Sequence, residues 1–139
     1  MHKLAALLNA VIFFLFWLAV LYAGADHPPP PGFVFLVLLD LAAAGLVYWR
    51  VPVYLAWIAS QRGNALLYVV RDGLVAGLAF AALPAASRWW LGGGEPTVAP
   101  TVAGTLIWFA VVGVVGALSA VTIYLANWGI AQYAARRDQ

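Results

Sequence analysis

The sequence predicts an all-α integral membrane protein, a bundle of four transmembrane helices. Of its 139 residues, 65% are hydrophobic and 9% are charged, whereas an ordinary soluble domain carries roughly 25% charged residues. The apolar residues also fall into four separate stretches, each long enough for the about 20 residues that a helix needs to cross the hydrocarbon of a bilayer. We therefore expect residues 1–139 to form a single transmembrane domain.

Prolines separate the first two predicted helices. Residues 4–24 hold no charged side chain and no histidine, and residues 26–32 then contain four consecutive prolines. Proline lacks the backbone donor of a helix and clashes with the preceding turn, so the first helix ends before this segment. The second predicted helix covers residues 33–58.

The third and fourth predicted helices follow a polar turn at residues 60–64. We expect the third helix at residues 65–87, with Asn64 as its N-cap. The loop at residues 88–96 contains three consecutive glycines, but it lacks the Lys-Ser/Thr pair of a phosphate-binding loop. This segment is therefore predicted to be a linker, and the fourth helix lies within residues 101–133.

The N-terminus also fits a second interpretation. Lys3, an apolar run and the sequence Ala23-Gly24-Ala25 resemble a secretory signal peptide with its cleavage site. The apolar run is about 20 residues long, however, and a signal peptide usually has an apolar core of about 7–15 residues. We therefore expect this segment to remain as a membrane anchor.

The positions of lysine and arginine predict the orientation. With four spans, Lys3, Arg62, Arg136 and Arg137 lie on one side of the membrane and Arg88 lies on the other. Cytoplasmic loops carry the excess of basic residues, so both termini are predicted to be cytoplasmic, in a plasma (inner) membrane. The aromatic residues expected at the two membrane surfaces agree with this orientation: Trp57, Trp128 and Tyr133 at the inner surface, and Tyr22, Trp89 and Trp90 at the outer surface.

Asp40 and Arg50 lie within the second predicted helix, where ionisable residues are costly and mark either a function or a buried partner. Both belong to a stripe with helical spacing, which comprises Asp40, Ala43, Val47, Arg50, Tyr54 and Trp57. The stripe is expected to face other helices rather than lipid. Ten residues, about 15 Å of helix, separate Asp40 from Arg50, so these two charges cannot pair.

Arg50 has a predicted partner in Asp72. If the second and third helices fold back on each other at the polar turn, these two residues lie at about the same depth. An arginine–carboxylate pair would then neutralise both charges in a low dielectric, either as a structural link or as a gate or proton-linked switch. Arg71 points about 100° away from Asp72 around the helix, and its side chain is expected to extend towards the membrane surface.

Asp40 has no basic residue at its own depth. Thr105 or Trp108 of the fourth helix could donate a hydrogen bond to it, and Arg88 could reach part of the way. One interpretation is a capped or partly hydrated structural carboxylate. The other is a proton or cation site within the membrane.

Two faces of small residues predict close packing between helices. On the third helix the face consists of Gly73, Gly77 and Ala81, and on the fourth it consists of Gly113, Ala117 and Ala120. Small residues let helix backbones approach closely in a membrane. The faces predict contacts with partner subunits, with copies of the chain or inside the bundle.

The sequence lacks the residues that several classes of function require. The chain has no cysteine, and its two histidines, His2 and His27, are expected on opposite sides of the membrane. We therefore expect no haem, zinc or copper site and no other cofactor. No catalytic motif is present, and the net charge of +2 gives no reason to expect nucleic-acid binding.

The sequence is therefore most consistent with a small accessory or structural subunit of a larger membrane protein complex, which is not an enzyme. The alternative is a homo-oligomeric small transporter or channel that uses Asp40 and the Arg50/Asp72 pair. A membrane enzyme or quinone-binding subunit has weaker support, because the abundant aromatic residues are explained by the membrane surfaces. The expected partners are the lipid bilayer and other integral membrane subunits or copies of this chain.

Overall fold

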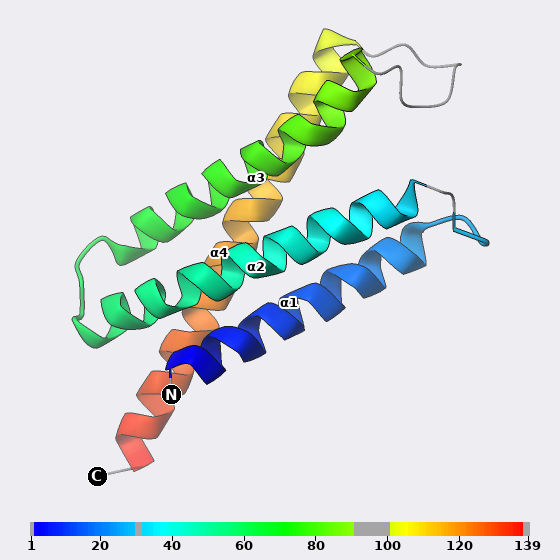
Figure 1. Ribbon diagram of the computed structural model, residues 1–139. Helices are drawn as coiled ribbons and strands as arrows, with labels where there is room; N and C mark the ends of the chain where they lie inside the picture. The colour runs from blue at the N-terminus through cyan, green and yellow to red at the C-terminus, as the bar shows by residue number, and fades with distance from the viewer. Residues whose placement is uncertain (1, 30–31, 91–100, 138–139) are drawn as a thin grey trace. The chain divides into compact units, whose positions relative to one another are not determined.

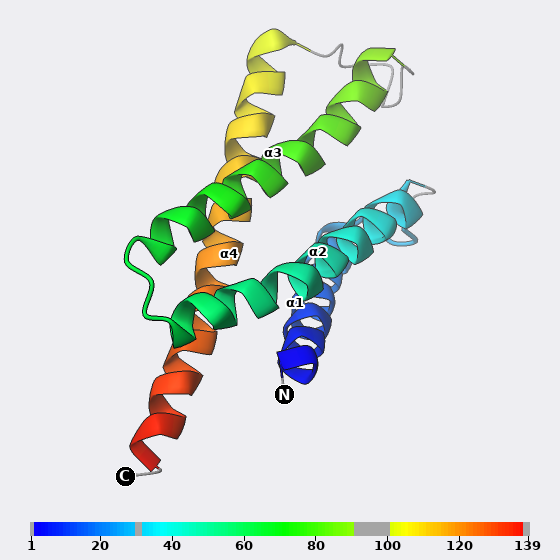
Figure 2. The same ribbon diagram turned by 60° about the vertical axis from the view of Figure 1, so that its left-hand side comes forward.

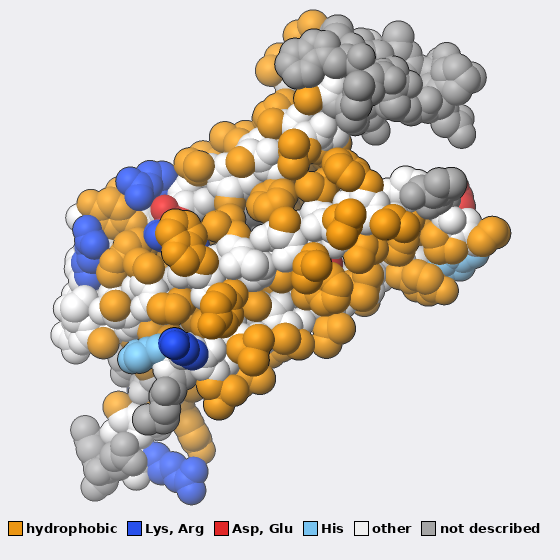
Figure 3. Space-filling model, in the orientation of Figure 1, with side chains coloured by type: hydrophobic (Ala, Val, Ile, Leu, Met, Phe, Trp, Pro, Cys, Tyr) orange, Lys and Arg blue, Asp and Glu red, His pale blue; other side chains and the backbone are white. Residues whose placement is uncertain are grey.

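The computed structural model describes residues 2–29, 32–90 and 101–137, and it describes residues 87–90 by their backbone alone. This part of the chain is all-α (Figure 1). Its helices are α1 (His2–Gly24), α2 (Phe33–Ala59), α3 (Ala65–Trp90) and α4 (Val102–Arg137). All four are long and apolar enough to cross a membrane, which confirms the predicted fold class at this level. Figure 3 shows that hydrophobic side chains cover much of the face in view.

The helices form two compact units, Met1–Arg62 and Gly63–Gln139. In the first unit α1 packs along α2, and the two helices lie side by side in both views (Figures 1 and 2). The residues of α1 that are buried are the small Ala6 and Ala10. A single transmembrane domain remains a prediction.

The C-terminal end of α2 is capped by backbone hydrogen bonds. Gln61 has a φ of 47°, in the left-handed region. Its N–H donates to the Ile58 carbonyl at 3.2 Å, and the N–H of Arg62 donates to the Trp57 carbonyl at 3.1 Å. This pair of bonds is the Schellman arrangement, which satisfies carbonyls that the end of a helix leaves open.

Asn64 directly precedes α3, as predicted for its N-cap, but its backbone conformation is not that of a usual N-cap. Its φ of 63° is left-handed, whereas an N-cap residue has an extended backbone. Asn64 contributes its backbone carbonyl, which accepts the N–H groups of Leu67 at 3.0 Å and Tyr68 at 3.3 Å.

Two helices extend beyond the expected ends. The third was expected to stop at residue 87 and continues to Trp90, and the fourth was expected to stop at residue 133 and continues to Arg137. Residues 134–137 are Ala-Ala-Arg-Arg, which are among the strongest helix formers. At 36 residues, α4 is about 54 Å long at 1.5 Å per residue.

Candidate functional site

Asp40 is buried in the first unit, on α2. Its exposed fraction is 7%, and its Oδ2 atom has no hydrogen-bond partner among the residues that the structure describes. A buried carboxylate without hydrogen bonds is costly in apolar surroundings. Asp40 is therefore a buried carboxylate whose desolvation is not offset by a described hydrogen bond to its Oδ2 atom.

The buried side of α2 includes the predicted stripe and is wider than it. Asp40 and Tyr54 are buried, and the other four stripe residues are partly buried. Ala44 and Val51 are buried as well. The helix therefore turns its charged stripe away from its most exposed side, as the cost of these charges in lipid requires.

Trp108, one of the two possible donors to Asp40, has a hydrogen-bond partner within its own unit. The indole N–H of Trp108 donates to the carbonyl of Ala81 on α3 at 3.1 Å, and indole has no second donor. Thr105 donates its hydroxyl to the Thr101 carbonyl at 2.9 Å, within its own helix. The side chain of Arg88, the third expected neighbour, lies outside the described side chains.

Arg50 lies among aromatic rings of its own helix. Its guanidinium carbon is 5.5 Å from the ring centre of Trp49, 5.7 Å from Tyr54 and 5.8 Å from Trp57. The guanidinium carbon of Arg62, just after the end of α2, is 5.2 Å from the ring centre of Trp57. These distances are within the about 6 Å range of cation–π attraction. Sequence reasoning placed Trp57 and Arg50 on one stripe but missed this cluster.

Asp72 accepts a hydrogen bond from Arg71, its neighbour in sequence. The Arg71 Nη2 to Asp72 Oδ1 distance is 3.3 Å, and the Arg71 guanidinium also lies 5.2 Å from the Tyr68 ring centre. Arg71 therefore turns towards Asp72, although a helical wheel separates the two by about 100°. The predicted partner Arg50 belongs to the first unit and Asp72 to the second, so the Arg50–Asp72 pair remains a prediction.

The two small-residue faces meet each other inside the second unit. A methyl group added at Gly73 would lie 2.7 Å from the Ala120 Cβ and 2.8 Å from the Ala117 Cα, and it would overlap the Gly116 carbonyl. A methyl group added at Gly77 would lie 3.0 Å from the Gly113 Cα. Helices this close leave no room for another helix between them. In this unit both faces are therefore occupied by their contact with one another.

Gly116 is the packing residue that sequence reasoning missed. A methyl group added there would overlap the Gly73 carbonyl and lie 2.9 Å from the Gly77 Cα. Gly116 precedes Ala117 and follows Gly113 by three residues, so helical spacing alone was sufficient to include it in this face. Ala81, the last member of the α3 face, is fully buried.

The described residues contain no group of three or more histidine, cysteine or acidic side chains that could hold a metal ion. The chain matches no family model, no curated protein and no solved structure at the level of significance that we required.

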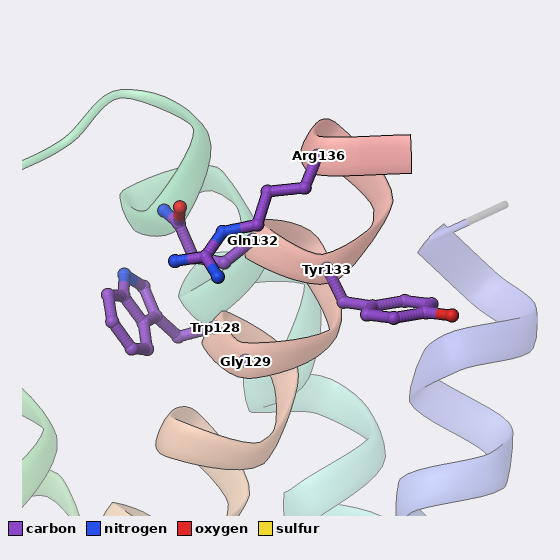
Figure 4. Close-up of a pocket in the computed structure, with 5 residues that line it drawn as sticks. All are labelled: Trp128, Gly129, Gln132, Tyr133 and Arg136. Carbon is purple, nitrogen blue, oxygen red and sulfur yellow. The ribbon is translucent and has the colours of Figure 1, made fainter. Parts of the chain in front are cut away.

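A shallow groove lies near the C-terminal end of α4. It is lined by Trp128, Gly129, Gln132, Tyr133 and Arg136, all from this one helix, and its volume is about 270 Å³. Figure 4 shows Trp128, Gln132 and Arg136 on one side of the helix and Tyr133 pointing away from them. Sequence reasoning treated Trp128 and Tyr133 as aromatic anchors and missed the spacing of four residues that joins Trp128 to Gln132 and Arg136.

Proposed function

We propose that this protein is an accessory or structural subunit of a larger membrane protein complex. The observation that supports this proposal is the composition of the described structure, in which four apolar helices account for nearly every residue. Such a chain has little mass outside a membrane with which to bind or convert a soluble substrate. Its exposed surface consists largely of leucine, valine, isoleucine and aromatic side chains, which suit contact with lipid and with other membrane helices.

The packing of α3 on α4 changes where a partner would attach. Because Gly73, Gly77 and Gly116 are in contact across the two helices, these small-residue faces hold the unit together. A partner subunit would therefore bind to other sides of the helices. The proposed location is a plasma (inner) membrane with both termini in the cytoplasm, as the distribution of lysine and arginine favours.

Purification of the full chain from its native membrane in mild detergent tests this proposal. We expect it to elute with one or more different membrane proteins in fixed stoichiometry. The matched measurement is a chain expressed alone, which should elute as a smaller particle. A native preparation that contains this chain alone would contradict the proposal.

A second candidate function is supported by Asp40. An Asp side chain that is buried and has no hydrogen bond to its Oδ2 atom among the described residues is the arrangement expected of a carboxylate that takes up a proton or a cation. The function would be that of a homo-oligomeric small transporter or channel. Its test is flux through liposomes that contain the purified chain, with Asp40→Asn as the variant and the exposed Asp26→Asn as its control. Absence of flux with the wild-type chain would exclude this candidate, and flux that survives Asp40→Asn would exclude a role for Asp40 in it.

A further inference from the structure

The last part of α4 extends past the beginning of α3. The contacts of Gly73 with Ala117 and of Gly77 with Gly113 place Ala65, the first residue of α3, level with Leu125. Residues 126–137 therefore continue for about 18 Å beyond α3 at 1.5 Å per residue. Figures 1 and 2 both show this extension. Since α3 begins directly after a polar turn, the extension starts near one surface of the membrane.

Three exposed hydrogen-bond donors follow one side of this extension. Trp128, Gln132 and Arg136 are spaced four residues apart, so they share a side of the helix. They supply an indole N–H, an amide NH₂ and a guanidinium. Among the described residues none of these side chains has a hydrogen bond or an ion pair, and Trp128 is 47% exposed. Figure 4 shows the Arg136 side chain folded back along the helix towards Gln132, which is the direction that helical side chains prefer.

Among the described residues, the charged side chains at this end of α4 are positive. Arg136 and Arg137 form the last turn of α4, and the helix contains no acidic residue. Asp72, the acidic side chain in the described part of this unit, is level with Leu118, about 15 Å along the axis from Trp128. The free carbonyls at the end of the helix carry partial negative charge, but the Arg136 guanidinium points away from them. A ligand of this groove should therefore be an anion that accepts several hydrogen bonds.

We propose that the groove binds the phosphate of an anionic phospholipid headgroup. The position of the groove favours a lipid as the ligand. Trp128 lies where α4 passes the start of α3, and tryptophan rings favour the boundary between hydrocarbon and headgroups. From there Gln132 and Arg136 face the headgroup layer, where arginines attract anionic lipids. This inference goes beyond the proposed subunit function and does not depend on it. It requires only that α4 crosses a membrane.

Native mass spectrometry of the full chain in mild detergent tests the proposal. The probes are phosphatidylglycerol and phosphatidylcholine with identical acyl chains, which differ in net charge. We expect one phosphatidylglycerol to bind about fivefold more tightly than phosphatidylcholine, since an arginine near the surface contributes about that factor. Arg136→Gln should remove this preference. The matched control is Arg137→Gln, which removes the same charge about 100° away around the helix and should keep the preference.

Trp128→Phe provides a second variant, because it keeps the ring and removes the donor. It should weaken phosphatidylglycerol binding while leaving the helix content, measured by circular dichroism, unchanged. Equal losses in Arg136→Gln and Arg137→Gln would overturn the proposal, since the effect would then be general charge attraction. The same conclusion would follow if the wild-type chain did not distinguish the two lipids. Displacement of the lipid by millimolar inorganic phosphate would overturn the assignment to a lipid headgroup. Displacement by a protein subunit that protects Arg136 from chemical modification would overturn it as well.

Discussion

Gly73 of α3 lies against the carbonyl of Gly116 of α4, so closely that neither position has room for a side chain. In water such a contact would add to a hydrophobic core, but lipid removes most of that driving force between helices. Association in a membrane depends instead on van der Waals packing, which improves as backbones approach. The glycines therefore stabilise the second unit because the absence of a side chain lets the two helix backbones approach closely.

Gly77→Ala should destabilise the contact between α3 and α4. The added methyl group would overlap the Val112 carbonyl and lie 3.0 Å from the Gly113 Cα, and overpacking of this kind costs about 1–3 kcal/mol. Thermal unfolding in detergent, followed by circular dichroism, measures the loss.

Gly45→Ala is the matched control for this change. Gly45 also lies inside a helix, but an added methyl group has no atom within 4 Å. Alanine is favoured over glycine in helices by about 1 kcal/mol, so this variant should be as stable as the wild type or more so. If both variants lost the same stability, the glycine contact would not be the cause.

The sequence predicts the four helices well because charge is scarce and long apolar runs are easily seen. It predicts the helix ends less well. Hydropathy alone places the end of α4 at the end of the last apolar run. Residues 134–137 follow that run, and their high helix propensity continues the helix beyond it. The polar turn at residues 60–64 is also found from sequence, but the left-handed backbone of Gln61 is not, because glutamine, unlike glycine or asparagine, is uncommon in that region.

Partners of buried groups were harder to predict than positions along a helix. Depth in the membrane suggested Trp108 as a donor to Asp40, but depth does not say which helix a side chain faces. Trp108 packs on α3 and donates to Ala81. A helical wheel likewise separated Arg71 from Asp72, although a long arginine side chain reaches back to its neighbour.

Asp40→Asn should leave the stability of the protein unchanged or raise it. The structure gives this carboxylate no hydrogen bond from the described residues, so the substitution removes no described bond and relieves the cost of a charge in apolar surroundings. Thermal unfolding in detergent measures the effect, with the exposed Asp26→Asn as control. A fall of several degrees for Asp40→Asn alone would mean that the carboxylate has a structural partner.

Two double-mutant cycles decide which arginine interacts more strongly with Asp72. The first combines Arg50→Gln with Asp72→Asn, and the second combines Arg71→Gln with Asp72→Asn. Arg71 is 63% exposed in its 3.3 Å contact with Asp72, and exposed pairs are worth about 0–1 kcal/mol. If the predicted Arg50–Asp72 pair forms within the membrane, its coupling should be larger, at about 1–3 kcal/mol. A coupling near zero in the first cycle would rule out this pair.

Labelling of single cysteines should place the C-terminus and the turn at residues 60–64 on the cytoplasmic side. The chain has no cysteine of its own, so each introduced thiol reports one position. Gln61→Cys and Gln139→Cys should react with a membrane-impermeant maleimide only after the inner face is opened, because the basic residues Arg62, Arg136 and Arg137 lie beside these positions. Gly93→Cys, in the loop with the single Arg88, should react in intact cells. Reaction of Gln61→Cys and Gly93→Cys from the same side would contradict a third helix that crosses the membrane. Reaction of Gln139→Cys in intact cells would contradict the cytoplasmic C-terminus.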